Sequence, residues 1–161
     1  MTAATDVSFR PELPEDEAFL AKLYATTRDI EMALTGWDAS RKETFLRMQF
    51  QLQTTHYRKY YSDASFQIIL GDNLPIGRIY LHYGAKEIRL MDIALLPEYR
   101  GSGIGGAILA NLLAEAAQSG RSVTLHVEPF NPALRLYQRL GFKTIEDLGG
   151  NLYMEWRHGG N

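Results

Sequence analysis

The chain has 161 residues, enough to bury a core of its own, and contains no cysteine, which excludes a small domain held together by disulfides. Its formal net charge is −2, from 17 Lys and Arg against 19 Asp and Glu, so neither a nucleic-acid-binding surface nor a polybasic membrane surface is indicated. Hydrophobic residues make up 45% of the chain, which is ordinary for a globular protein and argues against disorder.

The absence of cysteine also excludes thiol nucleophiles and thiolate zinc sites, and the four histidines do not stand at metal-ligand spacing. We therefore expect no metal. Residues 1–14 contain no apolar run of the kind found in secretory signals, and no segment approaches the length of about 20 apolar residues that spans a membrane. These features predict a cytoplasmic protein with no membrane partner.

The first part of the chain predicts one strand and two helices. Residues 7–9 alternate between apolar and polar types before two prolines, as in a strand that enters a turn, and the acidic residues 15–17 open a helix. A second helix runs from Ser40 to about Tyr61, because Ser40 and Glu43 have the spacing of a capping box. The apolar residues at helical spacing that we expect on its buried face are Phe45, Met48 and Leu52.

Three strands are predicted next, over residues 66–70, 76–83 and 88–95, and the tight turns between them indicate an antiparallel meander. A helix follows from Ile104 to about Gly120, with apolar residues on one face, and then a short apolar strand over residues 123–127. Because strand, helix and strand occur within about 40 residues, the strand 123–127 should lie parallel to the strand 88–95.

The C-terminal segment predicts one more helix and a hairpin. Asn131 stands where it can cap a helix that has Pro132 at its first position and ends at Gly141. Residues 142–148 and 152–156 then form the two strands of the hairpin. Since no linker or repeat is found, we expect one α+β domain over residues 1–161, with a mixed, mostly antiparallel central sheet flanked by helices.

The most informative segment is Tyr99-Arg100-Gly101-Ser102-Gly103-Ile104-Gly105-Gly106, which we call the glycine loop and which lies between a predicted strand and a predicted helix. Glycines allow the backbone to approach a phosphate closely, and the following helix offers unpaired N–H groups and a positive dipole end. The loop therefore predicts a site for a pyrophosphate.

Three interpretations of the glycine loop compete. A simple turn before a helix does not need four glycines in six residues, given their cost in backbone entropy. Gly101, Gly103 and Gly106 fit the dinucleotide-binding pattern G-x-G-x-x-G, but that pattern belongs directly after the first strand of a doubly wound domain. A nucleotide-triphosphate loop is excluded because no Lys-Ser or Lys-Thr follows the glycines.

The third interpretation rests on a resemblance. Arg100-x-x-Gly103-x-Gly105 resembles the acyl-CoA-binding motif of the GNAT superfamily of N-acetyltransferases. Downstream, the segment Asn131–Phe142 is similar in outline to a second motif of that family, with Tyr137 at the tyrosine position. The resemblance implies a GNAT-like α+β fold in which two parallel strands splay apart at the cofactor site, and an acetyl-CoA-dependent N-acetyltransferase.

The resemblance also implies which residues bind acetyl-CoA. The backbone of Ile93–Leu95 would pair with the pantetheine arm, and the amide of Ile93 would hold the thioester carbonyl, with Leu95 close by. Asn131 would contact the pantetheine or a bound water, although capping its helix is an equal alternative. The residues implied at the pyrophosphate are Arg100, Gly101, Ser102, Gly103, Ile104, Gly105 and Gly106.

For the chemistry, the resemblance implies that Tyr137 protonates or orients the leaving sulfur, since a phenol with a pKa near 10 remains a proton donor at neutral pH. His126 stands five residues before Asn131, where family members that acetylate protein N-termini place a glutamate, and its imidazole is a candidate base. A structural histidine is an equal alternative. Asp92, Glu128 and ordered water compete for the role of base, and Glu87 ranks last.

The acceptor is expected to be an amine of a small molecule or a peptide, bound by the first two helices, the loop between them and the C-terminal hairpin. Trp37 in that loop is a candidate for a lid or for a homodimer contact. Two other functions stay open: a CoA-binding module without catalysis and, more weakly, a nucleotide-dependent oxidoreductase. The identity of the amine, the preferred acyl chain and the oligomeric state are not predicted.

Overall fold

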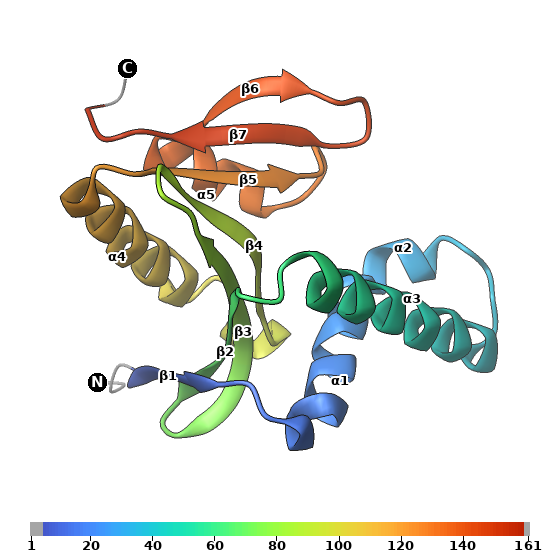
Figure 1. Ribbon diagram of the computed structural model, residues 1–161. Coiled ribbons are helices and arrows are strands. Elements are labelled where there is room, and N and C mark those ends of the chain that lie inside the picture. The colour runs from blue at the N-terminus through green and yellow to red at the C-terminus, as the bar shows by residue number, and fades with distance from the viewer. Residues whose placement is uncertain (1–4, 160–161) are drawn as a thin grey trace. The chain divides into compact units, whose positions relative to one another are not determined.

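A computed structural model describes residues 5–159, so the first four and last two residues of the expected 1–161 domain lie outside it. Seven strands form one sheet in the order β1-β2-β3-β4-β5-β7-β6 (Figure 1). The pair β4–β5 is parallel, whereas β1–β2, β5–β7 and β6–β7 are antiparallel. The expected mixed sheet with flanking helices is confirmed, as is the parallel pair.

Two compact units are present, and strands β3 and β4 run through both. The first unit contains the residues up to Ile79 together with Ile93–Arg100. Its elements are β1 (Val7–Pro11), the short 3-10 helix η1 (Pro14–Asp16), α1 (Glu17–Thr27), α2 (Asp29–Ala33), α3 (Ala39–Tyr60), β2 (Ser65–Gly71), the start of β3 (Leu74–Tyr83), the end of β4 (Glu87–Leu95) and η2 (Pro97–Tyr99).

The second unit contains Tyr80–Asp92 and the residues from Gly101 on. After the rest of β3 and β4, its elements are α4 (Ile104–Ser119), β5 (Ser122–Val127), α5 (Ala133–Leu140), β6 (Lys143–Asp147) and β7 (Leu152–Trp156). Figure 1 shows that β7, the last strand in the chain, lies between β5 and β6. The core of this unit is mostly apolar, with the polar Thr124 also buried, and its most buried apolar side chains are Ile88, Leu109, Val123, Leu125 and Met154.

Helix α3 begins differently from the prediction. The residue that caps it is Asp38, whose side chain accepts a hydrogen bond of 2.8 Å from the Arg41 amide, so the expected capping box of Ser40 and Glu43 is wrong. Glu43 instead forms an exposed ion pair with Arg47 one turn further along. The carboxylate of Asp38 outcompetes the Ser40 hydroxyl because it stands directly at the start of the helix.

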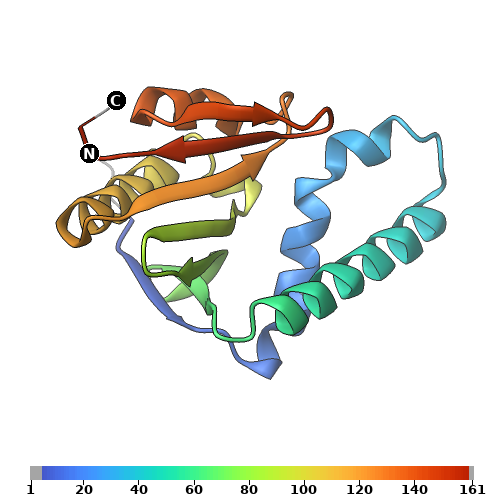
Figure 2. The same cartoon turned by 45° about the horizontal axis from the view of Figure 1, so that its top comes forward.

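The buried face of α3 also differs from the prediction. Phe50 is its one fully buried residue among those described, and it packs in a cluster with Leu20, Tyr24 and Ile68. Met48 and Leu52, which we expected to be buried, remain 51% and 59% exposed. Figure 2 shows the reason, because α1 and α3 diverge toward the loop that joins α2 to α3, and the first half of α3 extends away from α1.

A partly buried ion pair anchors the entry to α1. Both guanidinium nitrogens of Arg10 donate hydrogen bonds of 2.8 Å to the carboxylate of Asp16, which also accepts a bond of 2.8 Å from the Leu13 amide. The bonds from Arg10 hold the pKa of Asp16 below its ordinary value. Strand β1 and the turn before α1 are thereby joined through one carboxylate.

We predict that Asp16→Ala lowers the free energy of unfolding by about 1.5–3 kcal/mol at pH 7, the usual range for hydrogen bonds to charged groups. Because the folded-state pKa of Asp16 is depressed, its contribution is present above the unfolded pKa of about 3.9 and disappears as the pH falls through the folded value. Urea unfolding at pH 7 and at successively lower pH measures this. Glu15→Ala, at the exposed neighbouring position, should have little effect.

Candidate functional site

The parallel ladder between β4 and β5 stops early. Three residue pairs join the strands, from Glu87 opposite Ser122 to Arg89 opposite Thr124. Both strands continue past this point within the second unit, β4 through Leu90–Asp92 and β5 through Leu125–Val127, and no pair in the described chain joins these continuations. The two strands therefore separate after Thr124, as the expected splay requires, and leave backbone groups without a ladder partner.

The glycine loop follows the end of β4 and η2. Gly101 and Gly103 have φ angles of +71° and +87°, a left-handed conformation that side chains with a Cβ adopt only under strain. No heavy atom lies within 4 Å of the position that a Cβ would occupy on either residue, so open space faces the backbone at both. The glycines serve the backbone conformation and its accessibility, and not the packing of a neighbour.

Helix α4 begins directly after Gly103, which caps it without any side-chain hydrogen bond. The first N–H groups of an α-helix have no partner within the helix, so those of Ile104, Gly105 and Gly106 point out of its positive end. The Ile104 side chain is buried and fixes this end to the core of the second unit. The loop thus presents several amides to one point, and these amides are suited to a pyrophosphate.

Arg100, which precedes the loop, is held within the first unit. Its Nε donates to the carbonyl oxygen of Leu95 at 2.9 Å, and its Nη2 donates to the Thr26 hydroxyl at 3.0 Å. The side chain therefore ties the end of β4 to the end of α1. Ile93 and Leu95, the residues implied at the pantetheine arm, lie at this end of β4 and are half-buried.

Tyr137 lies on α5 and is only 7% exposed. Its ring packs edge-on against Phe142, with 5.6 Å between the ring centres. Burial raises the pKa of the Tyr137 phenol well above its ordinary value, and the negative charges of Asp92 and Glu128 raise it further. Tyr137 is therefore a protonated phenol under the electrostatic influence of two carboxylates, which are the same two that the sequence offered as candidate bases.

Asn131 precedes α5 and caps its first turn. Its side-chain oxygen accepts a hydrogen bond of 2.9 Å from the Ala133 amide, as expected of a capping side chain, although the helix begins at Ala133 and Pro132 holds the cap position. Its own amide donates to the Glu128 carbonyl at 3.0 Å. These two bonds fix the turn between β5 and α5, and with it the placement of Tyr137 one helical turn further on.

The helices of the second unit cover one face of its sheet. A Cβ on Gly106 would lie 3.6 Å from Leu136, which shows that α4 and α5 pack together, and the end of α5 at Gly141 lies against Trp156. Trp156 stands opposite Val123 in the β5–β7 ladder and shares its face.

His126 lies three residues from Val123 along β5, so alternation puts its side chain on the opposite face of the sheet from the helices. The two catalytic residues predicted from the sequence therefore belong to opposite sides of the sheet.

His126 takes part in a network that the sequence did not predict. Nη2 of Arg89 contacts its Nδ1, and the ring stacks at 5.1 Å on Tyr153, its partner in β7. Beside them the buried Thr124 hydroxyl donates to Glu87 at 2.8 Å. A guanidinium only donates, so Nδ1 supplies the lone pair and the neutral imidazole carries its proton on Nε2. The register of β4 against β5, unknown from the sequence, brings these groups together.

Burial lowers the pKa of His126, and the charge of Arg89 lowers it further, against a smaller opposite effect of Glu146. We predict that Arg89→Gln raises this pKa toward the ordinary value of about 6.5 without reaching it, since burial remains. Titration of the His126 ring resonances by NMR measures the change. Arg157→Gln, which removes a guanidinium paired with Glu155, should leave the titration unchanged, and an equal rise in both variants would contradict the assigned cause.

Within residues 5–159, no three histidine, aspartate or glutamate side chains gather closely enough to hold a metal ion. Across the same described residues, no helix is long and apolar enough to cross a membrane.

Comparison with known proteins identifies the kind of domain. A family model described as the Acetyltransferase (GNAT) domain matches residues 62–144, more than half of the chain. The [Ribosomal protein bS18]-alanine N-acetyltransferase of Haemophilus influenzae is 31% identical over 86 residues, which cover 53% of this chain and 58% of that protein. The mouse Cysteine-rich protein 2-binding protein is 46% identical over 61 residues, or 38% of this chain and 8% of that protein. The chain thus spans less than two thirds of the length of each of these relatives.

Solved structures show the same fold over nearly the whole chain. The PaiA N-acetyltransferase of Thermoplasma acidophilum, solved in complex with coenzyme A, matches with a TM-score of 0.71 at 22% identity, covering 95% of this chain and 99% of that one. Ard1 from Thermoplasma volcanium matches with a TM-score of 0.60 at 21% identity, covering 94% and 96% of the two chains.

Proposed function

Because the chain belongs to the GNAT family of acetyltransferases, we propose that it transfers an acetyl group from acetyl-CoA directly to an amine. The observation that carries this proposal is the end of the β4–β5 ladder after Arg89 and Thr124, next in the chain to a glycine loop with two left-handed glycines. Separated strands offer unpaired amides and carbonyls to the pantetheine arm, and the loop offers amides to a pyrophosphate.

The residues present fit this substrate. A Cβ would add strain at Gly101 and Gly103, whose backbone faces open space, and α4 begins there without a side-chain cap that would occupy its amides. We assign the amides from Gly101 to Gly106 to the pyrophosphate, and Arg100 to fixing the start of the loop through Leu95. Ile93 and Leu95 are assigned to the pantetheine arm, and Asn131 to the turn that presents Tyr137.

In the reaction, the amine nitrogen forms a bond to the thioester carbon and the carbon–sulfur bond breaks. Tyr137, whose phenol is protonated at neutral pH, gives its proton to the departing thiolate. His126 takes the amine proton at Nδ1, so the acceptor amine first displaces Arg89 from that atom. Without cysteine there is no thiol for an acyl-enzyme, and direct transfer in a ternary complex is the simplest route.

Thermal unfolding with acetyl-CoA, CoA and NAD in parallel tests the binding part of the proposal. At about 100 times its dissociation constant a ligand adds about 2.7 kcal/mol of stability, and we predict a rise in Tm of several degrees with both CoA species and none with NAD. Gly103→Ala should lose most of the CoA-dependent rise, because its Cβ strains the loop where the amides converge.

The matched control is Gly149→Ala, in the β6–β7 turn, where φ is +90° and no heavy atom crowds a Cβ. It carries a similar backbone strain of about 1 kcal/mol and should keep the full CoA-dependent rise. A rise with NAD alone would overturn the proposal, as would a wild-type protein that CoA does not stabilise.

We predict that Tyr137→Phe lowers turnover about 100-fold while the dissociation constant of acetyl-CoA changes less than about twofold, because only the proton donor is lost. Release of the CoA thiol with a panel of small amines and peptides measures turnover, and calorimetry measures binding. Tyr83→Phe, which changes another tyrosine of raised pKa at the end of β3, should leave turnover unchanged. Unchanged turnover in Tyr137→Phe would remove this residue from the chemistry.

A further inference from the structure

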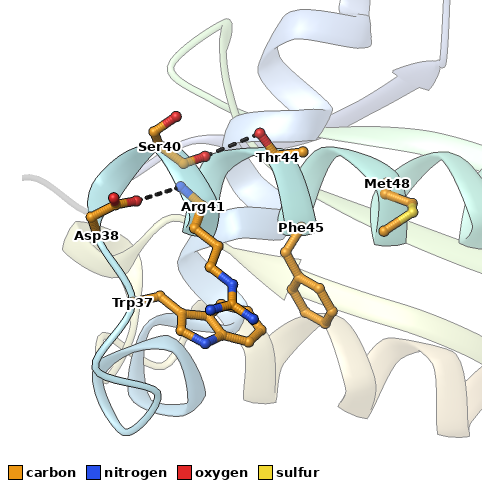
Figure 3. A pocket seen from close by; sticks show the side chains of 7 residues that line it. All are labelled: Trp37, Asp38, Ser40, Arg41, Thr44, Phe45 and Met48. Atoms are coloured by element: carbon orange, nitrogen blue, oxygen red, sulfur yellow. Dashed lines mark hydrogen bonds between the residues drawn. The ribbon is translucent and has the colours of Figure 1, made fainter.

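An open hollow lies at the start of α3, within the first unit. It measures about 510 Å³ and is lined from the loop before α3 and from the first three turns of the helix (Figure 3). We call it the Trp37 hollow; its lining residues are Trp37, Asp38, Ser40, Arg41, Thr44, Phe45 and Met48. Figure 3 shows Trp37, Arg41 and Phe45 directed to the same side of the helix.

Arg41 supplies the positive charge of the hollow, whose lining also includes the acidic Asp38. Its guanidinium lies over the Trp37 ring, 4.2 Å from the ring centre. No carboxylate in the described part of the chain pairs with this guanidinium. Asp38, the nearest acid in sequence, accepts a hydrogen bond from the Arg41 backbone and caps the helix. A stacked guanidinium keeps its N–H edge free, so Arg41 is ready to bind a carboxylate.

The hollow is fixed before any ligand arrives. The Trp37 amide donates to the Thr35 hydroxyl at 3.1 Å, and that hydroxyl donates to the Met32 carbonyl at 2.7 Å. Gly36 takes the left-handed φ of +71° that the bend between them requires. The Trp37 ring meets Phe45 edge to face at 5.3 Å. A ligand therefore loses little affinity to the ordering of these side chains.

An apolar strip continues from the hollow along α3. Phe45, Met48 and Leu52 follow at helical spacing, and the last two are more than half exposed. From Phe45 to Leu52 the strip is about 10 Å long, at about 1.5 Å per helical residue. An extended peptide covers that length with about three residues, at about 3.3 Å each. A single amino acid or a small amine would cover only part of it.

The charge of α3 favours an acidic ligand. Residues 39–60 contain five Lys and Arg and one Glu, although the whole chain has a net charge of −2. The single Glu43 is already paired with Arg47. A negatively charged segment is therefore attracted to this helix and to the free guanidinium at its start.

We propose that the Trp37 hollow binds a short peptide segment in which an acidic side chain adjoins an aromatic or large aliphatic one. The carboxylate pairs with Arg41, and the apolar side chain lies on Phe45 and Met48. The assignment of this segment to the acetyl acceptor rests on the proposed function, and it makes the acceptor a peptide or protein amine. Binding to the hollow does not depend on acetyl transfer.

The test uses blocked dipeptides that have no free amine and cannot be acetylated: acetyl-Glu-Phe-amide, acetyl-Gln-Phe-amide and acetyl-Glu-Ala-amide. The shift of the Trp37 indole N–H in nitrogen-15 NMR spectra of the full chain reports binding. We expect the Glu-Phe probe to bind about three- to fivefold more tightly than the Gln-Phe probe, as for an exposed ion pair. It should also bind more tightly than the Glu-Ala probe, because the phenyl ring buries apolar surface.

Arg41→Gln should remove the preference for Glu over Gln, whereas Arg47→Gln, on the same helix but outside the hollow, should retain it. Trp37→Phe keeps an aromatic ring under Arg41, so the preference for the Glu probe over the Gln probe should remain in this variant. Because the variant lacks the indole N–H, the Phe45 resonances report binding instead. Equal binding of the Glu and Gln probes, or no shift at Trp37, would overturn the proposal. A Trp37 shift that depends on protein concentration alone would place a second copy of the chain there and also overturn it.

A second measurement separates this proposal from the proposed function. If CoA binds and amines are acetylated while the blocked peptides do not bind, the hollow is not a peptide site and the enzyme assignment stands. If the chain acetylates amines and also binds the blocked peptides, Arg41→Gln should raise the KM for a free-amine acceptor peptide containing Glu-Phe about three- to fivefold with kcat unchanged. If Arg41→Gln leaves the KM unchanged, the hollow does not bind the acceptor, and the assignment of the bound segment to the acetyl acceptor is overturned.

Discussion

When two parallel strands separate inside a sheet, each keeps a row of backbone N–H and C=O groups that need other partners. In the second unit this separation begins after Arg89 and Thr124, and the features assigned to acetyl transfer follow from it. The strand ends supply unpaired amides, the glycine loop lies next along the chain, and the turn after β5 leads to Tyr137. The interruption of one hydrogen-bond ladder thus creates the polar groups that a thioester substrate requires.

In the second unit, the two residues proposed for proton transfer lie on opposite faces of the sheet, and each has a shifted pKa. On the helical face, burial raises the pKa of Tyr137 and the charges of Asp92 and Glu128 raise it further, so the phenol is protonated at neutral pH. On the other face, burial lowers the pKa of His126 and the charge of Arg89 lowers it further. The proposed direct transfer would take its proton donor from one side of the sheet and its proton acceptor from the other.

The sequence predicted most of the strands and helices because each carries a local signal: a short apolar run in β5, helical spacing in α4 and Asn131 before α5. The parallel β4–β5 pair also followed from element order. Helix α2 was missed because five residues give no periodicity, and the cap of α3 was misplaced because Asp38 competes with Ser40. The contact of Arg89 with His126 depends on strand register, which no local pattern encodes. That the chain works as one domain, and that its site residues act as assigned, stay predictions.

The position of β7 between β5 and β6 has a consequence for how the chain is made. During synthesis β5 and α5 leave the ribosome before β7, and the second edge of β5 stays uncovered until residues 152–156 have emerged. An uncovered edge strand is open to pairing with other chains. Completion of the β5 surface thus waits for residues 152–156. A nascent chain stalled before that segment would leave one edge of β5 exposed to pairing with other chains.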